Sequence, residues 1–83
     1  MSARRRFLLY SRAGCTLCEE MLAELLTIPG ASACPIEIVD IDCDAAARSR
    51  YGYKIPVLLF EGELVCHGRL DRDEVFKALA AVR

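Results

Sequence analysis

The sequence lacks the features that would take it into a membrane or onto a nucleic acid. None of its apolar runs approaches the roughly 18 residues that a membrane-spanning helix needs. Neither sign of charge prevails, because 11 Lys and Arg are set against 12 Asp and Glu, for a net charge of −1. A polyanion therefore exerts no general electrostatic attraction on this chain. We expect neither a membrane nor a nucleic acid among its partners.

We expect neither an export signal nor a disulfide scaffold. Behind the basic start, the apolar run covers only Phe7 to Tyr10, whereas an export signal needs about 7–15 apolar residues. The five cysteines are odd in number, and only Cys15 and Cys18 stand close together. With 54% hydrophobic residues, the chain can form a core without cross-links. We predict one small domain over residues 1–83, reduced and cytoplasmic.

Short apolar runs alternate with helical spacings along the chain. The predicted order is strand, helix, strand, helix, strand, strand, helix, at residues 7–10, 15–28, 36–41, 45–50, 57–60, 64–66 and from 72 onward. Pro29-Gly30 should end the first helix, and a loop should follow from residue 31 to residue 35. Asp71 with Glu74 forms a capping box for the last helix, whose buried stripe includes Val75, Leu79 and Val82.

The connections between these elements predict the sheet. Two strands joined through a helix should be parallel, by a right-handed crossover. The last two strands are separated by only three residues, 61–63, which permits an antiparallel hairpin alone. We therefore predict an α/β fold with a four-stranded mixed sheet and helices on both faces.

The sequence Cys15-Thr16-Leu17-Cys18 carries the clearest chemical signal, because it stands where the first strand gives way to the first helix. Unpaired backbone N–H groups and the partial positive charge of a helix N-terminus favour a thiolate over a thiol. Cys15 at the helix start should be the more exposed sulfur, and it would attack a substrate disulfide. Cys18, one turn further, would then attack Cys15 and release the reduced product.

Metal binding is the main alternative use of such a pair. A zinc site would need a second close pair, but Cys34 and Cys43 are nine residues apart. Cys66 and His67 are adjacent on a predicted strand and so point to opposite faces. We expect no metal held by a single chain, although an iron–sulfur or metal-binding dimer assisted by glutathione stays open. So does a non-catalytic adaptor.

Ile55-Pro56-Val57 is a second signal, since a proline is tolerated at the first position of a strand. A cis bond before Pro56 would leave the backbone groups of Ile55 free to pair with an extended substrate. Only about 5–6% of bonds before proline are cis, so the residues alone do not predict one.

Three motifs together resemble a known family. They are Leu9-Tyr10-Ser11 followed by Cys15-Thr16-Leu17-Cys18, Tyr51-Gly52-Tyr53-Lys54-Ile55-Pro56-Val57-Leu58, and Gly68-Arg69-Leu70-Asp71. With them the chain resembles the thioredoxin superfamily, and most of all the small bacterial glutaredoxin-like (glutaredoxin 2-like) proteins. The resemblance implies a thioredoxin-like three-layer sandwich, with Cys15 as nucleophile, Cys18 as resolving thiol and Pro56 as a cis-proline facing them. It also implies reduction of protein disulfides or of glutathione mixed disulfides.

The same comparison supplies the remaining expectations. Typical dithiol glutaredoxins have Pro and Tyr between the cysteines and Gly-Gly before the last helix, where this chain has Thr16-Leu17 and His67-Gly68-Arg69. We expect a monomer with no tightly bound cofactor, served by glutathione as a co-substrate or by a reductase. The candidate substrate-binding residues are Arg12, Thr16, Lys54, Ile55, Pro56, Gly68, Arg69 and Asp71.

Overall fold

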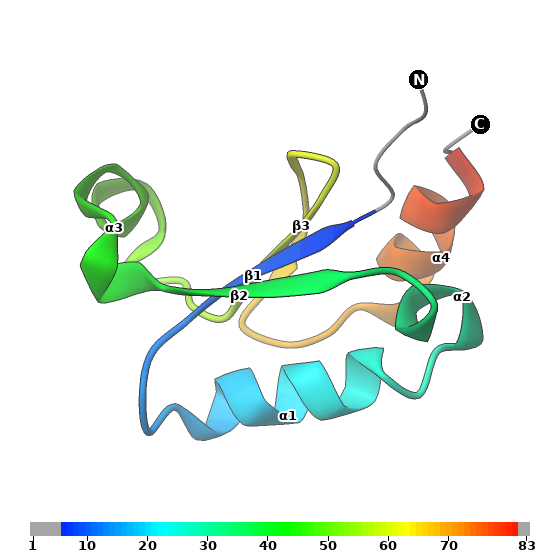
Figure 1. Cartoon of the computed structure of the whole chain (residues 1–83), viewed down its shortest axis with the longest axis horizontal. Helices are drawn as coiled ribbons and strands as arrows, with labels where there is room; N and C mark the ends of the chain where they lie inside the picture. The colour runs from blue at the N-terminus through cyan, green and yellow to red at the C-terminus, as the bar shows by residue number, and fades with distance from the viewer. Residues whose placement is uncertain (1–5, 82–83) are drawn as a thin grey trace.

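The computed structural model describes residues 6–81, so that Val82 of the predicted helical stripe lies outside the described residues. The elements in chain order are β1 (Phe7–Ser11), α1 (Thr16–Leu25), α2 (Pro29–Ser32), β2 (Ile36–Asp40), the 3₁₀ turn η1 (Ile41–Cys43), α3 (Ala45–Tyr51), β3 (Val57–Phe60), β4 (Glu63–His67) and α4 (Arg72–Ala81). Figure 1 shows α1 below the sheet, with α3 and α4 toward opposite ends.

The sheet has the predicted mixed topology. Its strands lie in the order β2-β1-β3-β4. β1 and β2 are parallel, while β1 with β3 and β3 with β4 are antiparallel. The register places Tyr10 opposite Val57, and Val57 opposite His67. The predicted fold class, a thioredoxin-like α/β fold, is confirmed.

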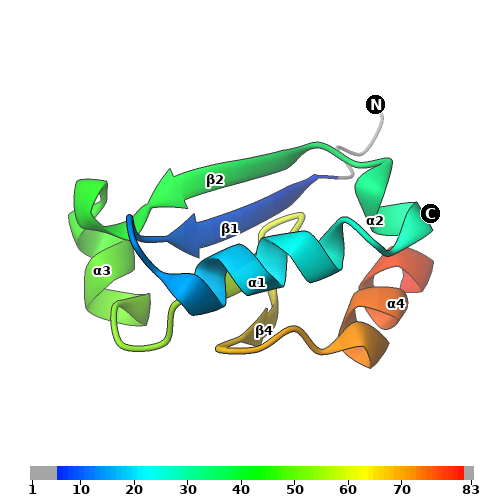
Figure 2. The same cartoon turned by 90° about the horizontal axis from the view of Figure 1, so that it is seen from below.

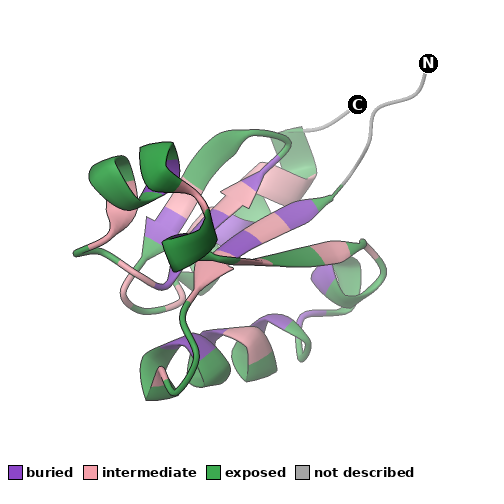
Figure 3. Ribbon diagram, turned by 60° about the vertical axis from the view of Figure 1, so that its left-hand side comes forward, coloured by how far each residue is buried: buried purple, intermediate pink, exposed green. Residues whose placement is uncertain are grey.

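One face of the sheet carries the main core. Phe7 and Leu9 of β1 are buried there with Met21 of α1 and Val75 of α4. Figure 2 shows α1 lying along this face, and Figure 3 shows the buried positions of α1 turned toward the strands. Alternate residues of a strand point to opposite faces, and Tyr10 stacks on Tyr51 of α3, with 5.5 Å between the ring centroids. α3 therefore covers the other face.

Two helices are capped by acidic residues, and the sequence predicted this role for Asp71. The Asp44 carboxylate accepts a hydrogen bond from the Ala47 N–H at 2.9 Å, at the start of α3. The Asp71 carboxylate accepts one from the Glu74 N–H at 3.2 Å, at the start of α4. Each bond satisfies a backbone donor that the first turn of a helix leaves unpaired.

Three local expectations were wrong. Pro29 was expected to stop the first helix, but that helix ends at Leu25 and Pro29 opens α2. A proline suits the first helical position because no N–H is needed there. Ala31 and Ser32, expected in a loop, therefore belong to α2. Ile41 belongs to η1 rather than β2, because the Asp40 carboxylate accepts a hydrogen bond from the Asp42 N–H at 2.9 Å and turns the chain.

β1 is fully buried on one of its two faces only. Phe7 and Leu9 are buried, whereas Leu8 and Tyr10 are only half-buried. The short helix α3 leaves part of their face open.

Within residues 6–81, no helix has the length and the apolar composition that a membrane span requires.

Candidate active site

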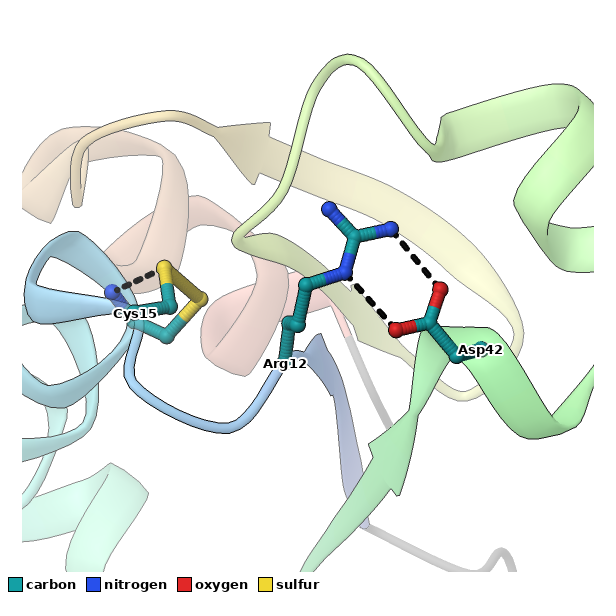
Figure 4. Close-up of a disulfide and its surroundings, with 4 residues drawn as sticks. Arg12, Cys15 and Asp42 are labelled. Carbon is teal, nitrogen blue, oxygen red and sulfur yellow. Dashed lines mark hydrogen bonds and ion pairs between the residues drawn. A yellow bond between two sulfur atoms is a disulfide. The ribbon is translucent and has the colours of Figure 1, made fainter.

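The two close cysteines lie at the junction between β1 and α1. Gly14 has a φ of +78°, a left-handed conformation that glycine adopts without a steric penalty, and it turns the chain from the strand into the helix. Cys15 is the N-cap of α1, with a backbone N–H that donates to the Arg12 carbonyl at 3.1 Å. A disulfide joins Cys15 and Cys18, whose Cα atoms are 5.2 Å apart (Figure 4).

The environments of the two sulfurs differ. The Cys18 side chain belongs to the buried side of α1 and is 3% exposed, whereas Cys15 is half-buried. The Cys18 N–H donates to the Cys15 Sγ at 3.2 Å. A helix N–H aimed at this sulfur favours negative charge on it. The reachable sulfur is therefore also the one that the helix terminus polarises.

The sheet register brings the other candidate segments to the same end. Since Tyr10 lies opposite Val57 and Val57 opposite His67, the end of β1, the start of β3 and the end of β4 share one edge. The Ile55–Pro56 bond is cis, as the resemblance implied. The Gly68 N–H donates to the Pro56 carbonyl at 2.8 Å, which ties the turn after β4 to the start of β3.

Arg12 does not extend freely into solvent. Its guanidinium makes a two-pronged ion pair with Asp42 of η1, in which Nε and Nη2 each lie 2.9 Å from a carboxylate oxygen. The hydrogen bond to Asp42 raises the pKa of Arg12, and the same bond lowers the pKa of Asp42. Sequence reasoning missed Asp42. A signal was present, because the ends of parallel strands meet at one edge and these two residues follow such ends.

A hollow of about 580 Å³ opens beside this ion pair. Arg12 lines it together with Arg48 of α3 and with Tyr53, whose side chain is fully exposed. Arg48 was not among the sequence candidates. The hollow lies between Arg12, just after β1, and α3 with the two residues that follow it, Gly52 and Tyr53.

The remaining candidate substrate-binding residues lie at the surface around the two cysteines or at the start of α4. Thr16 and Lys54 are exposed, and Ile55 is half-buried. Arg69 is exposed and lines a second hollow of about 600 Å³ after β4. Asp71 also lines it, but its carboxylate already caps α4. Asp71 thus serves the fold whether or not it contacts a substrate.

The other three cysteines are free thiols in different surroundings. Cys66 is buried beside the start of α4, and burial raises the pKa of its thiol. The Cys34 thiol donates to the Gly30 carbonyl at 3.4 Å. Cys43 is exposed in η1. Among the described residues, no three His, Cys, Asp or Glu side chains gather where they could hold a metal ion.

Comparison with known proteins identifies the family. The protein-family model for the glutaredoxin-like domain (DUF836) matches residues 6–80 of this chain. The chain belongs to this family. The resemblance to the thioredoxin superfamily is thereby confirmed for this glutaredoxin-like protein, which carries a Cys-X-X-Cys disulfide.

Two solved structures are similar to the glutaredoxin-like chain over most of its length. A Nitrosomonas europaea protein solved by NMR is 33% identical with a TM-score of 0.80, and the match covers 93% of each chain. An X. campestris protein solved by X-ray diffraction is 33% identical with a TM-score of 0.68, and the match covers 93% of this chain and 99% of that one. Comparison with curated proteins found no match.

Proposed function

We propose that this glutaredoxin-like protein is a thiol-disulfide oxidoreductase that reduces protein disulfides or glutathione mixed disulfides. The observation that carries the proposal is the asymmetry of the pair. Cys15 is the reachable sulfur and receives the Cys18 N–H, while Cys18 is 3% exposed behind it. That arrangement suits one thiol that attacks from outside and one that acts only within the protein.

The chemistry begins from the reduced pair. The Cys15 thiolate attacks one sulfur of the substrate disulfide, forming a Cys15–substrate bond and expelling the other sulfur as a thiolate that takes up a proton. Cys18 then loses its proton and attacks Cys15. The Cys15–Cys18 disulfide forms, the substrate leaves as its second thiol, and two electrons have passed from the protein to the substrate. Two glutathione molecules, or a reductase, would return those electrons.

The rim around Cys15 would hold the substrate. Ile55 precedes Pro56 just before β3 begins, where an extended chain would pair with its backbone. Gly68 and Arg69 border the same end from the turn after β4, and Thr16 and Lys54 are exposed beside it. In the hollow beside Arg12, a carboxylate of glutathione would meet Arg48, because the Arg12 guanidinium is already paired with Asp42. The reaction requires no tightly bound prosthetic group.

Cysteine variants test the proposal. Cys15→Ser should abolish reduction of a peptide–glutathione mixed disulfide, because the hydroxyl is a far weaker nucleophile than a thiolate. Cys43→Ser is the matched control, since it removes an exposed thiol outside the pair, and it should keep full activity. Cys18→Ser should accumulate a mixed disulfide on Cys15, from which the substrate can be identified by mass spectrometry. Activity of Cys15→Ser equal to that of the parent would refute the assignment of the nucleophile.

The same preparation tests the metal-binding alternative. Protein purified without oxygen should be a colourless monomer with a titratable dithiol. A coloured dimer that contains iron and sulfide would instead identify a cluster-binding module. A pair that does not exchange with glutathione would favour the adaptor.

A further inference from the structure

The loop that precedes Cys15 is held from two sides through Arg12. Its carbonyl accepts the Cys15 N–H at 3.1 Å. The Arg12 guanidinium donates one hydrogen bond to each carboxylate oxygen of Asp42, both at 2.9 Å. Figure 4 shows the guanidinium turned toward Asp42, with the disulfide at the other end of the loop. A two-pronged pair fixes the direction of an arginine as well as its position.

Asp42 is itself anchored to the sheet. Its N–H donates to the Asp40 carboxylate at 2.9 Å, and Asp40 lies opposite Ser11 in the parallel pairing of β2 with β1. Arg12 follows Ser11 directly. Asp42, which is 30 residues from Arg12 in the sequence, is therefore held next to it by a turn at the end of the neighbouring strand.

The orientation of Arg12 decides how much positive charge the attacking sulfur meets. A guanidinium free to turn toward Cys15 would stabilise its thiolate and draw in anionic substrates. Paired with Asp42, it presents almost no net charge at a distance. Other charges also act on this pair, since Asp40 acts on Arg12 and Arg48 of α3 acts on Asp42. Exposed charges also stand close to Cys15 and Pro56 in the sequence, at Glu19, Glu20 and Lys54.

We propose that Asp42 is a positioning residue that keeps the Arg12 guanidinium away from Cys15, and thereby limits the selectivity of the site for anionic disulfides. The proposal rests on the proposed function in one respect, that Cys15 is the attacking thiol. Asp42 touches no reacting atom and acts through Arg12. Replacing it would release a unit of positive charge into the approach to Cys15.

Two alkylating reagents that differ in charge can measure this effect. Iodoacetate is an anion and iodoacetamide is neutral, and both transfer a carbon of similar size to a thiolate. Their rates with Cys15 of the reduced protein at pH 7 are followed by mass spectrometry of the Cys15 peptide. One unit charge about 8 Å from the reacting sulfur in water changes such a ratio roughly twofold to threefold. Asp42→Asn should raise the iodoacetate-to-iodoacetamide ratio by about that factor.

A double-mutant cycle separates positioning from simple removal of a charge. If Asp42 positions Arg12, Asp42→Asn should raise the ratio clearly less in an Arg12→Gln background than in the parent. Asp42→Glu keeps the carboxylate and should leave the ratio close to that of the parent. Glu24→Gln removes the same charge at the far end of α1 and should have no effect. Asp42→Ser provides a second uncharged variant should Asp42→Asn fail to fold.

Equal changes in the two backgrounds would overturn the proposal, because Asp42 would then act only as a nearby charge. No change in either background would overturn it too. These results are distinct from failure of the proposed function, because alkylation requires no turnover. That failure would show as a Cys15 no more reactive toward iodoacetamide than the exposed Cys43.

Discussion

Gly52 links α3 to the segment that leads to Pro56, and it has no room for a side chain. Its backbone is right-handed, with φ −55° and ψ −31°, so that its conformation alone would accept alanine. A methyl group at Gly52 would, however, lie 2.6 Å from the Arg48 carbonyl oxygen and 3.2 Å from the Arg48 Cγ. The Gly52 N–H donates to that same oxygen at 2.8 Å. Gly52→Ala must therefore open the last turn of α3 or displace the segment after it.

The magnitude follows from two opposing effects. Overpacking against groups that cannot move aside costs about 1–3 kcal/mol. Alanine restricts the unfolded chain more than glycine does, which returns about 0.4–1 kcal/mol. We expect Gly52→Ala to lower the free energy of unfolding by about 1–2 kcal/mol, and Tm by about 5–15 °C for a domain of this size. Disulfide reduction should slow as well, because the same segment leads to Ile55 and Pro56.

Urea unfolding of the oxidised protein, followed by far-ultraviolet circular dichroism, measures the change. Gly30→Ala is the matched control, because the added methyl would approach only the Leu79 Cδ1, at 3.1 Å, which belongs to a side chain able to rotate. That variant should stay within about 1 kcal/mol of the parent. A Gly52→Ala protein as stable as the parent, with unchanged activity, would refute the argument.

Two further predictions concern stability. Asp71→Ala should cost about 1 kcal/mol, because it removes the acceptor of the Glu74 N–H; Asp73→Ala removes an acidic residue from the same turn without removing that cap, and urea unfolding should show a smaller loss. Burial raises the pKa of the Cys66 thiol, so that this thiol ionises at a lower pH in the unfolded chain than in the folded protein. The contribution of the buried thiol to stability is therefore complete below about pH 9 and is lost as the pH rises. The free energy of unfolding of the oxidised protein should decrease above that pH, and the decrease should be less steep in Cys66→Ala; equal slopes would contradict the assignment to this thiol.

Most of the fold could be predicted because local signals and long-range packing agree. The run 57–60 is apolar throughout and bounded by a proline and by the turn 61–62, and β3 has the predicted bounds. Pro29 shows where local signals fail, since a proline can follow one helix or open the next. Ala31 of α2 is fully buried in the core, where α2 packs against α4. No local pattern contains that contact.

The candidate site also has one part that the sequence predicts and another that it does not. The position of Cys15 and Cys18 follows from the strand-to-helix junction, which the local sequence marks. The pairing of Arg12 with Asp42 does not, because it depends on the register that sets Ser11 opposite Asp40. A register is determined by the whole sheet. The predicted parallel strands indicate that the residues after them lie close together, but only the register shows that Arg12 and Asp42 pair.

The difference between the two active-site sulfurs has its origin in the packing of α1. Cys18, Met21 and Leu25 are the buried residues of this helix, and their spacing of three and four places them on one face. The contact that fixes α1 against the sheet therefore also removes Cys18 from solvent. Cys15 precedes that stripe at the N-cap, where the chain leaves the sheet edge and the sulfur stays within reach. The amphipathic pattern that stabilises the fold thus also buries one sulfur of the pair and leaves the other accessible.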